Sequence, residues 1–156
     1  MNAKRRTFLK SAGAASTVVV AVAAGLIKPT SVMAAEWNKP AFEAKGMSDA
    51  LKALGSVGAA DSKDILIKAP DIAENGAVVP VEVTSKIAGT NSIVVMVEKN
   101  ANPLTAEFNL MNGAEGYVST RIKMGQTSNV RVVVKAGGKS YTAVKEVKVT
   151  IGGCGG

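Results

Sequence analysis

The last five residues of the chain carry the pattern that most clearly suggests chemistry, because a cysteine stands there between two pairs of glycines. Cys154 is the only cysteine among 156 residues. The glycines are Gly152, Gly153, Gly155 and Gly156. Glycine loses more conformational freedom on ordering than any other residue, so this segment predicts a flexible arm that reaches on the order of 15 Å when extended. The pattern favours a thiol that is delivered into the active sites of other proteins.

The surroundings of the thiol in sequence support the same interpretation. A catalytic cysteine needs a base or a cation to form thiolate, and no such residue adjoins Cys154. A carrier thiol can leave its activation to partner proteins. Two alternatives stay open, namely a disulfide that joins two subunits and an incidental thiol. A lipid anchor does not fit, because lipoprotein cysteines directly follow the signal peptide.

The composition excludes several other kinds of site. The chain has no histidine and one cysteine. It therefore cannot build a histidine-based catalytic triad, a His/Cys zinc site, a c-type haem attachment, a cysteine-ligated iron–sulfur cluster or an internal disulfide. We expect no bound cofactor and no metal.

The first 34 residues predict a signal peptide of the twin-arginine type. Arg5 and Arg6 open the string Arg-Arg-x-Phe-Leu-Lys, and a mildly apolar run of about 16 residues follows. Small residues then favour cleavage after Ala34 or Ala35. The alternative is a membrane anchor, but the run is shorter than the roughly 20 strongly apolar residues that a stable span needs. We expect export of the folded chain to the periplasm.

The net charge of +7 is mostly a property of this leader. Five of the 19 basic residues lie among the first 28 residues, where there is no Asp or Glu, which leaves 14 basic against 12 acidic residues. The mature chain is therefore almost neutral. A nucleic-acid partner is not expected.

Residues 35–151 predict one all-β domain with a short N-terminal helix. Apolar residues recur at helical spacing near 40–55, with a proline at the start and Gly55 at the end. After the helix, β-branched runs alternate with Gly, Asn or Pro turns, which is typical of an immunoglobulin-like β-sandwich of about seven strands. The expected strands cover residues 64–69, 77–85, 91–99, 105–111, 117–124, 129–136 and 140–151. Residues 152–156 form the predicted arm.

Two of these strands are apolar on both faces. Residues 93–97 and 132–134 are continuous apolar runs, so the second face must also be covered. We favour a protein partner, rather than the N-terminal helix, as the cover of this second face. Pro80 predicts an edge strand or a bulge, since proline cannot donate to the ladder.

Two polar groups have both a structural and a functional interpretation. Arg121, Lys123 and Arg131 suit a solvated strand face better than a basic docking surface. Residues 70–76 contain Asp71, Glu74 and Asn75 and suit a capped turn better than a cation site.

Taken together, the terminal motif, the leader and three internal strings resemble the SoxY family of the periplasmic sulfur-oxidation (Sox) system. The strings are residues 70–76, Val79-Pro80-Val81 and Arg121-Ile122-Lys123-Met124. The resemblance implies an immunoglobulin-like sandwich that pairs with a SoxZ-like β-sandwich subunit as a heterodimer. It also implies that Cys154 is the attachment point for sulfur.

The resemblance further implies a carrier without turnover of its own. A haem-containing cytochrome complex would couple thiosulfate to Cys154, and a dimanganese hydrolase would release sulfate. A molybdenum sulfane dehydrogenase, where present, would oxidise the remaining sulfur.

Two rival functions remain open. The first is a ubiquitin-like sulfur carrier, which would hold sulfur as a thiocarboxylate on Gly156 after adenylation by ATP. The second is a structural periplasmic sandwich joined to a partner through a disulfide at Cys154. The resting adduct, the partner's contact residues, the higher oligomeric state and the fate of the remaining sulfur are left open by the sequence.

Overall fold

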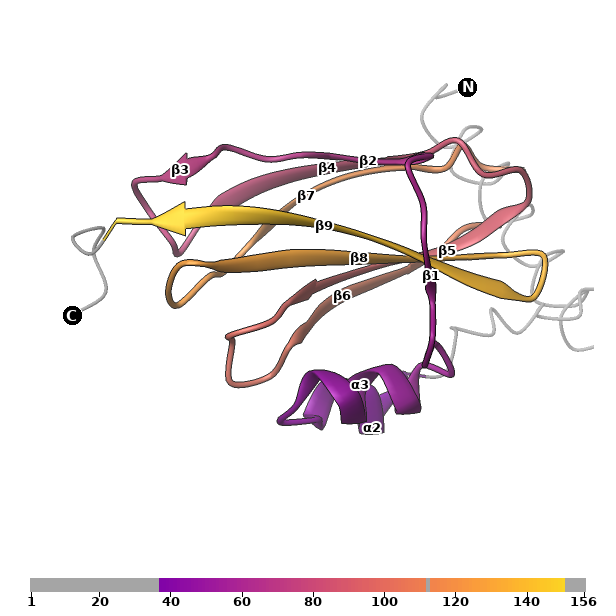
Figure 1. The fold of residues 1–156 in the computed structure, drawn as a ribbon, viewed down its shortest axis with the longest axis horizontal. Coiled ribbons are helices and arrows are strands. Elements are labelled where there is room, and N and C mark those ends of the chain that lie inside the picture. The colour runs from indigo at the N-terminus through magenta and orange to yellow at the C-terminus, as the bar shows by residue number, and fades with distance from the viewer. Residues whose placement is uncertain (1–36, 112, 151–156) are drawn as a thin grey trace, which may run out of the picture. The chain divides into compact units, whose positions relative to one another are not determined.

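The computed structural model describes residues 37–111 and 113–150, which form a β-sandwich with two short helices (Figure 1). The helices are α2 (Lys39–Glu43) and α3 (Met47–Ala53). The strands are β1 (Ala60–Asp61), β2 (Ile65–Lys68), β3 (Ile72–Ala73), β4 (Val79–Ser85), β5 (Thr90–Val97), β6 (Leu104–Asn109), β7 (Tyr117–Ile122), β8 (Ser128–Ala136) and β9 (Lys139–Val149).

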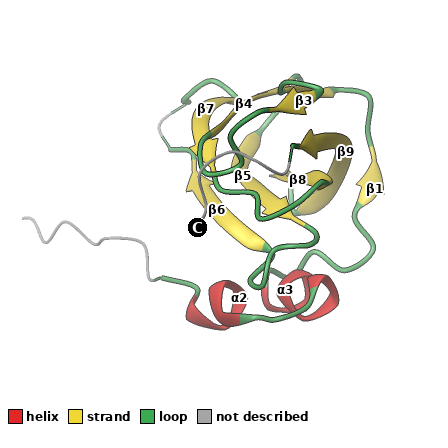
Figure 2. Ribbon diagram, turned by 90° about the vertical axis from the view of Figure 1, so that its left-hand side faces the viewer, coloured by secondary structure: helices red, strands yellow, loops and turns green. Residues whose placement is uncertain are grey.

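The strands form two sheets that make the layers of the sandwich (Figure 2). The larger sheet has the order β1-β9-β8-β5-β6, and β3 pairs with β9 beside this path. The smaller sheet has the order β2-β4-β7. The short strands β1 and β3 run parallel to β9, and the other pairs are antiparallel. The predicted all-β sandwich is confirmed.

The main core lies between the two sheets, where alternate residues of the long strands point inward. On β4, Val79, Val81 and Val83 are fully buried, whereas Pro80 between them is exposed. The residues of the larger sheet that join this core include Ile93, Val95, Val97, Val130, Val132 and Val134. Their β-branched side chains pack well on a pleated surface, which explains why these runs form strands.

The single helix predicted for residues 40–55 is wrong, since the chain forms two helices there. Ala44 and Gly46, between α2 and α3, have extended backbone. Glycine is unfavourable inside a helix by about 1 kcal/mol, and the side chain of Asn102 accepts a hydrogen bond from Lys45 Nζ and donates one to the Phe42 carbonyl. At the break, the Phe42 carbonyl therefore accepts from the β5–β6 loop instead of from a helical N–H. The predicted end at Gly55 is confirmed, with φ of 65° there.

The helices cover the outer face of the larger sheet, and this explains the strands that are apolar on both faces. Val94, Met96 and Val133 form a second core with Ala50 and Leu54, all almost fully buried. Both views place the helices against this face (Figure 1 and Figure 2). The preference for a protein partner as the cover of these residues was wrong. The broken helix supplies two short apolar surfaces that bury them within the chain.

Pro80 lies on a central strand but is paired on one side only. Its strand, β4, is the central strand of the smaller sheet, so the expected edge strand is wrong for β4 as a whole. However, β2 ends at Lys68 opposite Glu82, so Pro80 has a strand partner on the β7 side alone. Because one side of this end of β4 is unpaired, the missing N–H interrupts no ladder there.

Two strands were not predicted. Both β1 and β3 have two residues and join the larger sheet by parallel pairing to β9. β3 lies inside residues 70–76, where turn-forming residues predicted a loop. Neither α2 nor α3 is long and apolar enough to cross a membrane.

Candidate functional site

The residues that the sequence singled out for function lie outside the part of the chain that the structure describes. These are Cys154, Gly152, Gly153, Gly155, Gly156, Arg5 and Arg6. The structure does describe the chain up to residue 150, one residue short of the predicted arm. We call residues 148–150 the root.

The root continues strand β9 beyond its partner β8. The ladder between these strands ends where Ser128 pairs with Val147, so Lys148 and Val149 have no partner on β8. On the other side, β3 pairs in parallel with them, with Ile72 opposite Lys148 and Ala73 opposite Val149. β3 therefore pairs with the two residues of β9 that β8 leaves unpaired.

Hydrogen bonds fasten the root to β3 and to the residues on either side of it. Lys148 N donates to the Asp71 carbonyl at 3.0 Å, and Thr150 N donates to the Ala73 carbonyl at 3.1 Å. The Thr150 hydroxyl also donates to the Glu74 carbonyl at 3.4 Å. These bonds leave the N–H of Val149 without an acceptor on β3.

Thr127, in the loop before β8, supplies that acceptor. Val149 N donates to Thr127 Oγ1 at 2.9 Å, and the same hydroxyl donates to the Val149 carbonyl at 3.4 Å. One side chain thus satisfies both backbone groups of Val149, in the place where β8 would have done so. Thr127 is a functional candidate that sequence reasoning missed.

Gly76 closes the third side of the root. Its carbonyl accepts a hydrogen bond from Met124 N at 2.7 Å. A Cβ at position 76 would overlap the Met124 carbonyl oxygen and would lie 2.8 Å from Val149 Cγ1. Glycine is required here because the Met124 and Val149 atoms leave no room for a Cβ, and not because of a positive φ. Asn75 shapes the turn by accepting a hydrogen bond from Ala77 N at 2.9 Å.

The structure describes both polar groups that had alternative interpretations. Asp71 forms an ion pair with Lys145 at 3.0 Å, and Asn75 caps the turn that follows β3, so the expected capped turn is confined to the end of residues 70–76. Arg121 is exposed on the smaller sheet. Arg131 belongs to the larger sheet and binds Glu98 instead. Arg121 and Arg131 therefore lie on different sheets, and Lys123 is exposed just after β7.

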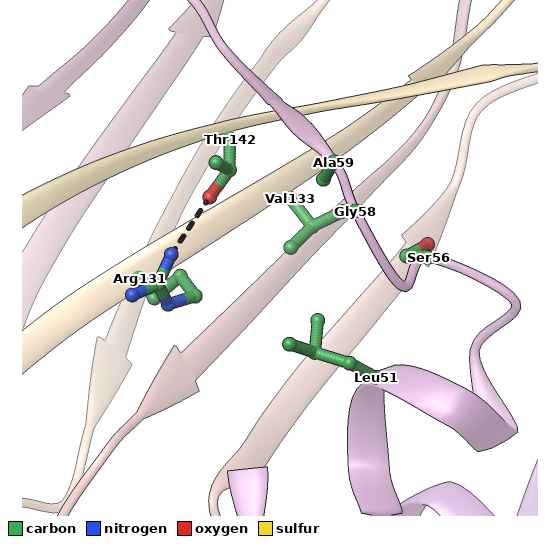
Figure 3. A pocket seen from close by; sticks show the side chains of 7 residues that line it. All are labelled: Leu51, Ser56, Gly58, Ala59, Arg131, Val133 and Thr142. Atoms are coloured by element: carbon green, nitrogen blue, oxygen red, sulfur yellow. Dashed lines mark hydrogen bonds between the residues drawn. The ribbon is translucent and has the colours of Figure 1, made fainter. Parts of the chain in front are cut away.

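A pocket of about 160 Å³ lies between the loop after α3 and the larger sheet (Figure 3). Its lining is Leu51, Ser56, Gly58, Ala59, Arg131, Val133 and Thr142. Arg131 Nη1 donates to Thr142 Oγ1 at 3.5 Å, and its other nitrogens contact Glu98 Oε1 at 2.8 and 3.1 Å. Because Glu98 neutralises the guanidinium, the pocket offers an anion no uncompensated charge. The root is the better candidate site.

Comparison with known proteins decides the family. The family model of the sulfur oxidation protein SoxY matches residues 51–154, from α3 to the cysteine itself. The chain belongs to the SoxY family. Among solved structures, it is similar to that of the sulfur carrier protein SoxY from Chlorobium limicola f thiosulfatophilum, with 46% sequence identity and a TM-score of 0.59. That similarity covers 65% of this chain and 92% of the other. None of the curated proteins matches the chain.

The SoxY match includes both the root and the strands that hold it. Residues 71–76, Thr127 and β9 all fall inside the matched range. The family resemblance drawn from the terminal motif and the internal strings is therefore confirmed.

Proposed function

We propose that this SoxY-family chain carries sulfur intermediates covalently on the Cys154 thiol while thiosulfate is oxidised. The observation that carries the proposal is the extent of the SoxY match, which reaches the only cysteine of the chain. The solved relative from Chlorobium limicola f thiosulfatophilum is itself described as a sulfur carrier protein. Residues 152–156 would serve as the carrier arm, which is joined to the root through residue 151.

The first step joins thiosulfate to the thiol by oxidation. Cys–SH and S2O3²⁻ give Cys–S–S–SO3⁻, one proton and two electrons. A new S–S bond forms, and the two sulfur atoms that it joins lose the electrons. The acceptor is a haem cytochrome complex, which belongs to the partner proteins. The chain supplies the nucleophile and the tether, and the partner supplies the oxidant.

The second step removes sulfate by hydrolysis. Water attacks the sulfonate sulfur, the S–SO3 bond breaks, and the products are Cys–S–SH, sulfate and one proton. A dimanganese hydrolase of the partner set would activate the water. A molybdenum sulfane dehydrogenase, in organisms that have one, would then oxidise the persulfide sulfur. The chain acts as a substrate carrier and catalyses none of these steps.

The carrier subunit would work in a heterodimer with a SoxZ-like β-sandwich subunit. Membership in the SoxY family supports this partner. The apolar face of the larger sheet that α2 and α3 bury is not free for this partner.

Intact-mass measurement tests the carrier proposal. The chain is incubated with thiosulfate and the full periplasmic extract, and its mass is compared before and after a reductant is added. We expect a mass gain on Cys154 equal to S2O3, or to one sulfur where the hydrolase has released sulfate, and reductant should remove either, because an S–S bond holds it. Sulfur on the Gly156 carboxylate would support the ubiquitin-like alternative. Consumption of thiosulfate by the isolated chain would contradict the carrier role.

We also propose that the twin-arginine route exports the chain in folded form to the periplasm. The string from Arg5 to Lys10 supports this route. In a strain that lacks the twin-arginine translocase, we expect the full-length precursor to accumulate in the cytoplasm. A variant with Lys at both Arg5 and Arg6 should behave in the same way in the parent strain. Undiminished mature chain in the periplasm of either strain would rule out this route.

A further inference from the structure

The root is the end of an overhanging strand, and such an end normally frays. The last two residues of β9 extend past β8, so the ladder that holds the rest of β9 is absent there. Backbone N–H groups that are left unpaired at a strand end exchange their hydrogens freely with water. In this chain the root is held instead by β3 and by one threonine side chain.

The holding contacts come from segments that are distant in sequence. Thr127 is 22 residues from Val149, and Glu74 is 76 residues from Thr150. Gly76 brings its turn so close to Val149 that no side chain fits between them. A strand needs none of these contacts merely to end, so they fix the position of residues 148–150 beside β3.

We infer that Thr127 is a positioning residue that, with β3 and Gly76, anchors the root and thereby sets the reach of the carrier arm. The inference rests on the proposed function, because it concerns delivery of the Cys154 thiol. If the root came loose from residue 148, three more residues would join the tether, and the tether would lengthen by about 10 Å at 3.3–3.6 Å per residue. A longer tether dilutes the thiol at a partner's active site.

The test replaces Thr127 by valine, which keeps the shape of the side chain and removes its hydroxyl. In the full exported chain, we expect the Val149 amide hydrogen to exchange about fivefold faster, because its acceptor is lost. We expect partner enzymes to load sulfur onto Cys154 about twofold more slowly, following the −3/2 power of tether length. Alkylation of the thiol by iodoacetamide should stay unchanged, since a small reagent needs no docking.

Two further variants separate positioning from a general loss of stability. Thr127→Ser keeps the hydroxyl and should restore both the exchange rate and the loading rate. Thr84→Val is the matched control, because Thr84 is a half-buried strand residue of the smaller sheet that pairs with Tyr117, and it should change neither rate.

Each outcome bears on the inference. Wild-type exchange and loading in Thr127→Val would overturn the anchor. Faster exchange with unchanged loading would show an anchor without a role in reach, and would also overturn the inference. If the wild-type chain itself takes up no sulfur on Cys154, the proposed function fails, and the exchange data still report whether Thr127 holds the root.

Discussion

Replacement of Cys154 by serine is expected to abolish thiosulfate-dependent loading of the chain and sulfur oxidation by the complete system. The serine hydroxyl has nearly the same size as the thiol but forms no S–S bond, so no sulfur intermediate can be attached. We expect the thermal midpoint to change little, because β9 is already held by β8, β3 and Thr127 before the chain reaches residue 151. Intact mass and thiosulfate consumption by the reconstituted system are the measurements.

The matched control places the same serine one residue later. Gly155→Ser keeps the thiol, so loading should continue, with at most a modest decrease from the added side chain. If Cys154→Ser retained sulfur oxidation but lost a covalent dimer, the structural disulfide would be the correct role of this cysteine. A sulfur adduct that persisted in Cys154→Ser would have to resist reductant, because the chain has no other thiol, and it would support the Gly156 carboxylate as the carrier site.

The fold class followed from local patterns that survive in the structure. Alternation along β4 and the continuous valines of β5 and β8 are local features, and burial in the two cores bears them out. The same patterns could not say what covers the second face of a strand. Val94 and Met96 look the same in sequence whether a partner or a helix buries them. The helices that bury these residues are separated by a break before Met47, and helical periodicity in the sequence does not predict that break.

The candidate site could also be predicted only in part from the sequence. Cys154 and its glycines are evident from composition alone, since a single cysteine between glycines is a local signal. The root is not evident, because β3 is two residues long and lies among turn-forming residues. Parallel pairing over such a distance leaves no periodic trace. Thr127 carries no signal either, as its role comes from a hydroxyl that meets a distant backbone amide. The Asn75-Gly76 pair predicted a turn, but it did not predict that this turn packs against Val149.

Replacement of Gly76 by alanine is expected to damage both stability and delivery. The added methyl group would overlap the Met124 carbonyl and press on Val149 Cγ1, so backbone on one side must move. Overpacking of this kind costs about 1–3 kcal/mol in the free energy of unfolding. Movement of the turn also pulls Ala73 and Glu74 away from the root, so the Thr150 amide should lose protection. Urea denaturation and amide exchange measure the two effects.

Two other glycines make the Gly76 result specific. Gly125→Ala lies one residue from Met124, and its nearest neighbour, Asn100 Oδ1, would be 3.9 Å away, so the stability change should stay within about 0.5 kcal/mol. Gly116→Ala would meet the Ser85 carbonyl at 2.7 Å and should destabilise the sandwich as Gly76→Ala does. Ser85 is the last residue of β4, whereas the Gly76 turn precedes Val79 at the other end of that strand. Gly116→Ala should therefore lower the free energy of unfolding in water as much as Gly76→Ala does, but leave the Thr150 amide protected. Equal loss of Thr150 protection in both variants would mean that the root merely follows global stability, whereas loss in Gly76→Ala alone would make the turn a local clamp on the strand that presents the thiol.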